Sequence, residues 1–304
     1  MSAAERDEDE KLCCASCGIA GIDDVKLKDC DGCDLVRYCS DECQELHRPE
    51  HAGKCRKRAA ELRDEILFKQ PESRCDGDCP ICCLPIPIDP KKSAMMSCCS
   101  KIICKGCTFA NFKREDEGRL QHKCPFCRKT LLTTKEENNE QRMKRVEAND
   151  PVAMRHMGTA ICHKGDYKAA FECFTKAATL GDAAAHYQLS CLYEEGRGVE
   201  KDEKKELHHL TEAAIGGNPS ARHNLGCVEG NNGRMDRAAK HFIIAAKLGH
   251  DDSLGAVKDL YKDGYVSKDD FAEALRGHHA AIVATKSPQR EEAEKFFAER
   301  LAKR

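Results

Sequence analysis

The sequence predicts a multidomain protein in which two small metal-stabilised α+β modules precede an all-α helical-repeat solenoid. Eighteen of the 22 cysteines lie before residue 128, and most are spaced as C-x2-C. After Asp150 a helical pattern recurs with a period of roughly 32 to 36 residues. Aromatic residues make up only 5% of the chain and Trp is absent. Small metal modules and Ala-rich repeats need no large aromatic core, so the composition fits both parts.

The cysteine spacing favours zinc over disulfide bonds. A two-residue turn between cysteines points both thiolates at one place, and two such pairs complete the tetrahedral shell that zinc prefers. A disulfide framework needs an oxidising compartment. The first residues, MSAAERDEDEKL, hold five acidic side chains and no apolar run, so they do not resemble a secretory signal. We therefore expect a cytoplasmic or nuclear protein, with residues 1–13 as a disordered acidic tail.

Charge and hydropathy exclude two classes of partner. The densest apolar stretch, Phe242 to Ala246, is far shorter than the roughly 20 residues of a membrane-spanning helix. The formal net charge is −2, and thiolate ligands make the zinc-loaded chain more negative still. A nonspecific nucleic-acid binder would show a strong basic excess instead. We expect protein partners, with neither a membrane nor nucleic acid among them.

The first cysteine cluster resembles a MYND zinc finger over residues 14–55. The resemblance rests on the ligand spacing, on "YCS" at 38–40 and on "CQELH" at 43–47. It implies two zinc ions in an interleaved arrangement. One ion would be held by Cys14, Cys17, Cys39 and Cys43, and the other by Cys30, Cys33, His51 and Cys55. His47, one helical turn before His51, is the alternative ligand. Fingers of this family bind short peptide segments of partner proteins and perform no chemistry.

The second cluster, in residues 79–128, is similar to a RING domain, with "CPIC" at 79–82 and "CPFCR" at 124–128. It holds up to two zinc ions, and its candidate ligands are Cys79, Cys82, Cys98, Cys99, Cys104, Cys107, Cys124 and Cys127. One feature departs from the family, because Lys101 stands where a RING normally has a histidine ligand, and a protonated lysine cannot bind zinc. Either Cys98 and Cys99 both bind, which we favour, or the site borrows a side chain such as His122.

The RING resemblance makes enzymatic activity an open alternative. RING ubiquitin ligases present a hydrophobic residue in the first knuckle, a proline in the last and a basic residue after the last ligand. Ile81, Pro125 and Arg128 occupy these positions and would contact a ubiquitin-conjugating enzyme. Such a ligase holds no catalytic residue of its own. The other interpretation is a module that only folds and docks, since structural zinc alone justifies the cysteines.

The C-terminal half reads as helical repeats over residues 150–281. Three units, 150–181, 182–217 and 218–249, precede a degenerate fourth that begins at His250. Each has Ala at one position of its first helix, an Ala pair near the end of its second, and then a helix-ending Gly. With "YEEGRGVEKDEKK" at 193–205, the units resemble Sel-1-like repeats, relatives of the tetratricopeptide class. The resemblance implies a solenoid whose concave face binds partner proteins.

The remaining segments connect these modules. We expect a helix and linker at 56–78, a charged linker helix at 129–149 and a final helix within 282–304 that begins at Ser287-Pro288. Phe296 and Phe297 give that helix an apolar stripe, which predicts that it caps the open end of the repeat stack.

The motifs favour an intracellular zinc-binding protein-interaction adaptor over an enzyme. The chain shows no Gly-rich phosphate loop, nucleophile elbow or paired-carboxylate pattern. Partners would bind the finger at 14–55 and the solenoid. The alternative is a RING-type ubiquitin ligase that recruits a conjugating enzyme through 79–128 and its substrate through the repeats.

Overall fold

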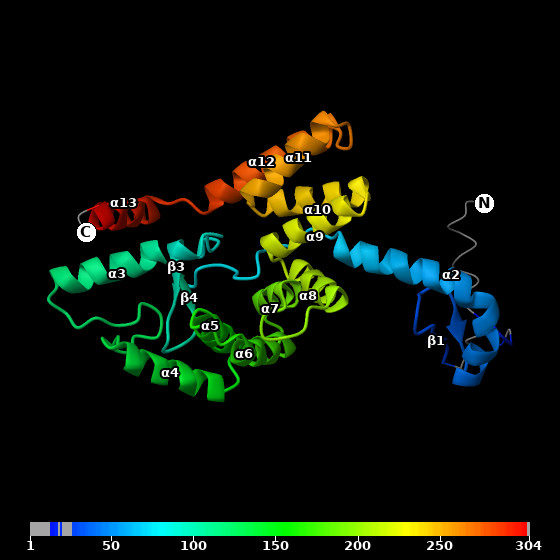
Figure 1. Ribbon diagram of the computed structural model, residues 1–304, viewed down its shortest axis with the longest axis horizontal. Coiled ribbons are helices and arrows are strands. Elements are labelled where there is room, and N and C mark those ends of the chain that lie inside the picture. The colour runs from blue at the N-terminus through cyan, green and yellow to red at the C-terminus, as the bar shows by residue number, and fades with distance from the viewer. Residues whose placement is uncertain (1–12, 18, 20–25, 303–304) are drawn as a thin grey trace. The chain divides into compact units, whose positions relative to one another are not determined.

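The computed structural model describes residues 13–17, 19 and 26–302 (Figure 1). All of the expected acidic tail except Cys13 lies outside the described residues. The chain divides into two compact units, Met1–Lys69 and Gln70–Arg304.

The first unit is a short hairpin followed by one long helix. Strands β1 (Lys28–Asp29) and β2 (Arg37–Tyr38) pair antiparallel, with Lys28 opposite Tyr38. Helix α2 (Asp41–Leu67) begins at Ser40, whose side chain accepts a hydrogen bond from the backbone N–H of Cys43. The helix therefore starts inside the finger, earlier than the helix expected from residue 56. Arg58 ties it back to the loop before β2 through a forked ion pair with Asp34.

The second unit begins with a cysteine-rich module. A 3-10 turn, η2 (Pro90–Lys92), leads into the antiparallel pair β3 (Ser93–Met95) and β4 (Ile102–Cys104). Helix α3 (Lys105–Glu117) follows β4 directly, and the Cys104 side chain accepts from the N–H of Cys107 at its start. Buried Ile86, Met96 and Ile103 form the small core of this module. The β-hairpin and α3 therefore present their cysteines from rigid elements.

The rest of the second unit is helical. Helix α4 (Lys135–Glu147) starts with a capping box between Thr134 and Glu137 and packs on α5. Successive helices then pack as antiparallel neighbours, and they are α5 (Pro151–Cys162), α6 (Tyr167–Thr179), α7 (Ala183–Glu195), α8 (Glu203–Ile215), α9 (Pro219–Asn231), α10 (Met235–Lys247), α11 (Asp251–Lys262) and α12 (Lys268–Ala284). The predicted fold class is confirmed: cysteine-rich modules with a few short strands precede a helical-repeat solenoid.

The repeat pattern explains why the helices stack. The aligned alanines Ala153, Ala185 and Ala221 are fully buried, as small residues must be where helices approach closely. The glycines that end the second helices, at 181, 217 and 249, have φ of +87°, +81° and +90°, a backbone conformation in which side chains are strained. Each following helix starts with a side-chain cap, from Asp182, Asn218 or His250.

The segment after α2 is held by the repeats rather than free. The backbone N–H of Cys75 donates to the carbonyl of Gly217, and Arg74 donates to the carbonyl of Leu248. Asp76 forms an ion pair with Arg155, which also pairs with Asp182. Arg74 and Cys75 thus contact two successive inter-repeat turns directly, and Asp76 is linked to the turn at Asp182 through Arg155 of α5. These contacts join the cysteine-rich module to the solenoid.

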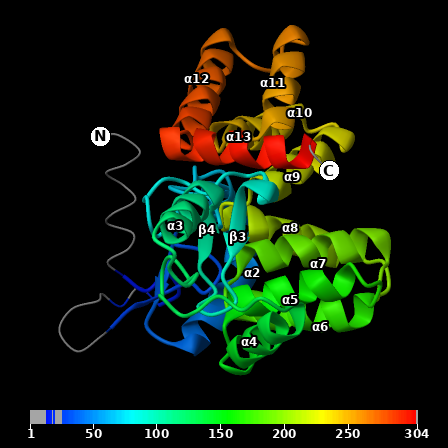
Figure 2. The same ribbon diagram turned by 90° about the vertical axis from the view of Figure 1, so that its left-hand side faces the viewer.

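The last helix differs from the expectation. Helix α13 (Pro288–Ala302) begins where predicted, with the Ser287 hydroxyl accepting from the N–H of Arg290. It does not cap the repeat stack but packs across α3 (Figure 2). The reason is apolar complementarity, because Phe296 and Phe297 pack on Phe109, with ring centroids 4.8 and 6.1 Å away.

Candidate metal centres

Two groups of four ligand atoms assemble in the first unit. Site 1 comprises Cys14, Cys17, Cys39 and Cys43, and site 2 comprises Cys30, Cys33, His51 and Cys55. Within each group the ligand atoms lie within 4.8 Å of one another. Cys43, His51 and Cys55 reach their sites from one face of α2, because they are spaced in multiples of four residues. The grouping is the interleaved one that the MYND resemblance implies.

His47 lies on the same face of α2 but outside site 2. Its Nδ1 is 3.0 Å from the Tyr38 hydroxyl, and its ring stacks on that of His51 at 5.6 Å. His51 Nε2 instead lies 3.2 Å from Cys33 Sγ. Burial, and after it the neighbouring His47 and Lys54, lowers the pKa of His51, so its ring stays neutral at pH 7. A neutral imidazole is the form that binds zinc.

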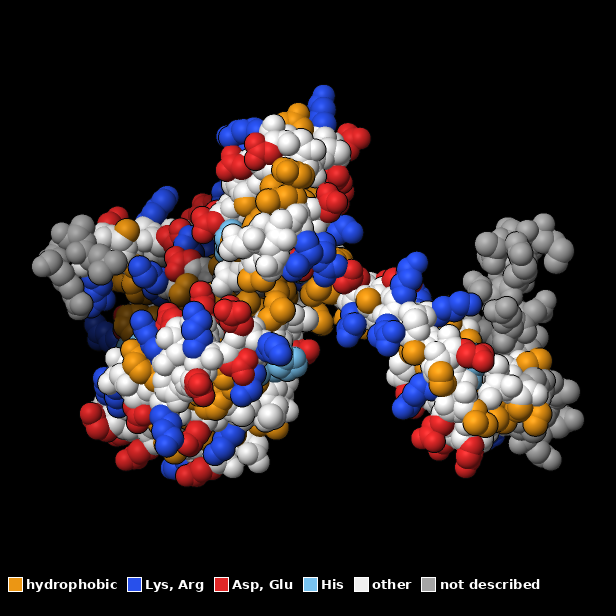
Figure 3. Space-filling view, turned by 45° about the vertical axis from the view of Figure 1, so that its right-hand side comes forward, with side chains coloured by type: hydrophobic (Ala, Val, Ile, Leu, Met, Phe, Trp, Pro, Cys, Tyr) orange, Lys and Arg blue, Asp and Glu red, His pale blue; other side chains and the backbone are white. Residues whose placement is uncertain are grey.

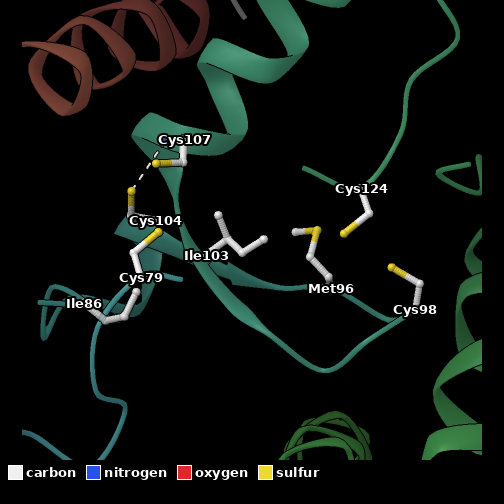
Figure 4. Packing of buried hydrophobic residues seen from close by; sticks show 8 residues of the cluster. All are labelled: Cys79, Ile86, Met96, Cys98, Ile103, Cys104, Cys107 and Cys124. Atoms are coloured by element: carbon white, nitrogen blue, oxygen red, sulfur yellow. Dashed lines mark hydrogen bonds between the residues drawn. The ribbon is translucent and has the colours of Figure 1, made fainter. Parts of the chain in front are cut away.

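Two further groups assemble in the cysteine-rich module of the second unit. Site 3 comprises Cys79, Cys82, Cys104 and Cys107, and site 4 comprises Cys98, Cys99, Cys124 and Cys127. Figure 4 shows members of site 3 at one end of the small core and members of site 4 at the other, with Ile103 and Met96 between them. The first and third cysteine pairs thus share one site, and the second and fourth share the other.

The structure shows which side chains make up site 4 in place of the histidine that Lys101 replaces. Cys98 and Cys99 both contribute their sulfur atoms to site 4. The Lys101 ammonium lies over the ring of Phe126, 5.7 Å from its centroid. His122 stacks on Phe112 and lies near Glu115 and Asp116 rather than at the site. Site 4 therefore assembles four sulfur ligands without the usual histidine and without His122.

The sulfur spacing fits zinc and excludes disulfides. All 22 cysteines are free. Tetrahedral zinc at 2.3 Å from each sulfur separates the sulfurs by about 3.8 Å. The close Sγ–Sγ distances within the four sites run from 3.3 Å for Cys98–Cys127 to 3.9 Å for Cys99–Cys124. A disulfide would need about 2.05 Å.

A hydrogen bond between two buried thiols of site 3 shifts their pKa values in opposite directions. Cys79 and Cys104 are both 0% exposed. A hydrogen bond from Cys104 lowers the pKa of Cys79 to about 4 against the opposing effect of burial, and raises the pKa of Cys104. Of the two thiols, Cys79 is therefore the one that ionises more readily. A dication offsets the cost of ionising the remaining buried thiols.

The three residues singled out for a conjugating enzyme differ in their surroundings. Ile81 is 42% exposed in the first knuckle, and Pro125 is half-buried. Arg128 is exposed but tethered, since it donates to Asn111 Oδ1 at 3.0 Å and lies 3.4 Å from a carboxylate oxygen of Glu115. Glu115 is itself buried, so Arg128 also has the structural task of balancing its charge.

Several residues beside the sites could not be found from the sequence. The Ser97 hydroxyl, next to Cys98, lies 2.9 Å from Asn138 Oδ1 on α4. Arg290 of α13 reaches Cys82 of site 3 across more than two hundred residues of chain. Neither contact follows a periodic or spacing signal, because both arise from how helices distant in sequence dock on the module.

Comparison with known families supports two of the modules. Residues 14–55 match the sequence model of the MYND finger, and residues 151–182, 183–218 and 219–250 each match that of the Sel1 repeat. The chain carries a MYND finger and three Sel1 repeats. With the MYND match and four clusters of suitable geometry, zinc is the metal of these centres. Both are protein-interaction modules.

Curated relatives and solved structures match part of the chain. "DAP3-binding cell death enhancer 1" from Mus musculus is 25% identical over 186 residues, and that from Rattus norvegicus is 34% identical over 186 residues. Each match covers 48% of this chain and 36% of the relative, so the chain spans about a third of their length.

Among solved structures, a Sel1 repeat protein from Oxalobacter formigenes is 28% identical, with a TM-score of 0.42, over 49% of this chain and 64% of that one. A protective antigen of uropathogenic Escherichia coli with an SLR fold is 17% identical, with a TM-score of 0.33, over 54% of this chain and 48% of that one. Of the helices that the structure describes, none has the length and apolar composition needed to cross a bilayer.

Proposed function

We propose that the sixteen side chains of sites 1 to 4 each bind zinc, and that the loaded chain is an intracellular adaptor. The observation that carries this function is the presence, in one chain, of a MYND finger with both ligand groups assembled and three Sel1 repeats. The finger would take a peptide segment of one partner, and the repeats would bind a second partner or another part of the first.

Exposed apolar side chains support peptide binding at the MYND finger. Leu46 on α2 is 76% exposed although it neighbours the zinc-bearing face of the helix. Single exposed apolar residues are common, but one beside a rigid zinc site is well placed to anchor a peptide. Leu46→Ala should weaken partner binding about tenfold while leaving the zinc content unchanged. Ile66→Ala, an exposed apolar change near the other end of α2, is the matched control.

The names of the curated relatives provide a first partner to test. They are described as binding DAP3, and we propose that this chain binds it as well. Calorimetric titration of the zinc-loaded full chain with purified DAP3 should give a saturable interaction that Leu46→Ala or a change in the repeats weakens. If the zinc-loaded chain does not bind DAP3, DAP3 is excluded as a partner. The adaptor function would then be tested by a screen for other partners with the same variants.

A second candidate function is that of a ubiquitin ligase. What favours it is the interleaved pairing of sites 3 and 4 together with the exposure of Ile81 and of Phe126, 42% and 43%. If the module recruits a conjugating enzyme, autoubiquitination with a panel of such enzymes yields chains, and Ile81→Ala abolishes them without loss of zinc. No chain formation by a fully loaded chain would exclude the ligase.

A further inference from the structure

The first turn of α13 inserts a buried cation beside site 3. The Arg290 side chain is only 5% exposed. Its guanidinium donates to the carbonyls of Pro85 at 2.8 Å and Leu84 at 3.1 Å, which directly follow the first knuckle. It also donates to Cys82 Sγ at 3.4 Å. One side chain of the C-terminal helix therefore contacts both a proposed zinc ligand and the backbone that positions it.

Arg290 lacks the usual partner of a buried arginine. No Asp or Glu among the described residues forms an ion pair with it. A buried cation without an anion is strongly unfavourable. The Cys82 sulfur lies within reach and would be a thiolate in the zinc-loaded site, where a zinc ion with four thiolates carries a net charge of −2. The loaded site 3 thus supplies the negative charge that Arg290 requires, and Arg290 offsets part of the charge of the site.

The module is shaped to admit this side chain. Gly106, at the start of α3, faces Arg290 so closely that an added Cβ would lie 2.8 Å from Arg290 Cγ and 3.0 Å from its Cα. The neighbouring Gln289 donates to the carbonyl of Gly106 at 3.2 Å. Further along α13, Phe297 packs near Phe109, and Glu292 forms an ion pair with Lys113. Helix α13 therefore packs on a complementary surface of the module beside site 3.

We propose that α13 is a zinc-dependent latch, in which zinc at site 3 and the docking of α13 stabilise each other through Arg290. The inference rests on the proposed zinc ligation of site 3. By linkage, loss of the zinc weakens the hold on the helix, and loss of the helix weakens the hold on the zinc by the same factor. Release of α13 would uncover the apolar face of α3 at Phe109.

The test compares zinc release from the full-length, zinc-loaded chain and two variants. Arg290→Met keeps the length and apolar stem but removes the charge and its donors. In excess metallochromic chelator at neutral pH, one of the four zinc ions should leave this variant about 10- to 100-fold faster, as expected when a group supporting a metal ligand is lost. Arg300→Met, an exposed arginine on the same helix, should leave all release rates unchanged.

Two readouts locate the effect. Alkylation of newly freed thiols, followed by mass spectrometry, should find Cys79, Cys82, Cys104 and Cys107 modified first in Arg290→Met. Hydrogen exchange of the α13 amides should accelerate in the same variant. If Arg290 only secured the helix, α13 would exchange faster while zinc release stayed at the wild-type rate, and that result would overturn the proposal.

Two further variants keep the test decisive if Arg290→Met does not fold. Arg290→Lys retains the charge without the forked donors and should show an intermediate release rate. Phe297→Ala loosens α13 without touching the guanidinium, and it should also speed zinc loss at site 3. Wild-type release rates in both would contradict the latch. A wild-type chain without zinc at site 3 would overturn the proposed ligand set as well as the latch.

Discussion

At the scale of single residues, the choice between two histidines one helical turn apart decides the chemistry of site 2. His47 and His51 share a face of α2, so helix periodicity does not separate them. What separates them is Tyr38, a buried residue of β2 whose hydroxyl engages His47. His51 remains free to approach Cys33. The proposed ligand is thus selected by a tertiary hydrogen bond that the sequence does not display.

This geometry predicts different effects of replacing each histidine. His51→Ala should remove one zinc ion per chain, because three ligands remain where tetrahedral zinc needs four. His47→Ala should retain all the zinc and cost about 1 kcal/mol of stability, the usual value of one hydrogen bond. Elemental analysis and denaturant unfolding of the two variants provide the comparison. Equal zinc loss in both would show that His47 also binds metal.

At the scale of elements, the two helices of a repeat pack closely because a glycine on one helix faces an aromatic ring on the other. In the third repeat, Gly226 of α9 faces Phe242 of α10, and an added Cβ would lie 2.6 Å from the ring. Gly158 and Phe174 show the same arrangement in the first repeat, at 2.7 Å. In each pair the missing side chain makes room for a ring that fills the space between the helices.

Gly226→Ala should therefore destabilise the protein by about 1–3 kcal/mol through overpacking. The control is Gly255→Ala in α11, where an added Cβ meets nothing within 4 Å. There the better helix propensity of Ala should stabilise by up to about 1 kcal/mol. Thermal unfolding of both variants measures the contrast. A stabilising effect at Gly226 would mean that the α9–α10 interface is looser than the structure indicates.

The sequence predicts the repeat helices but not the packing partner of the last helix. The repeat helices follow from a pattern present three times in the sequence, and local spacing confines the ligands of each knuckle. The destination of α13 was predicted wrongly, because Phe296 and Phe297 mark an apolar stripe but not its partner. The packing surface formed by Phe109 and Gly106 is created only when the module folds.

At the scale of the whole molecule, charge and metal loading set how the chain responds to its surroundings. Basic and acidic side chains are interspersed on the face shown in Figure 3. The protonation of the cysteine ligands makes zinc binding depend on pH. In the metal-free chain, burial is the largest cause that raises the pKa of Cys55 and of Cys107 to about 12. These thiols are therefore protonated at pH 7 until zinc displaces their protons.

Zinc affinity should consequently fall as the pH falls, because the loaded folded chain holds fewer protons than the metal-free one. Each proton displaced makes the affinity change about tenfold per pH unit. Competition with a chelator of known pH dependence, between pH 8 and pH 6, measures the slope. A flat profile over this range would mean that the ligands are already ionised without metal, contrary to the burial of Cys55 and Cys107.

The number of zinc ions per purified chain, determined by elemental analysis against an accurate protein concentration, tests directly whether all four sites bind metal. Four assembled sites predict a value close to four. A value close to two would restrict zinc to the MYND finger and show that sites 3 and 4 bind no metal. Protein that holds no zinc when its cysteines are kept reduced would contradict zinc binding at all four sites.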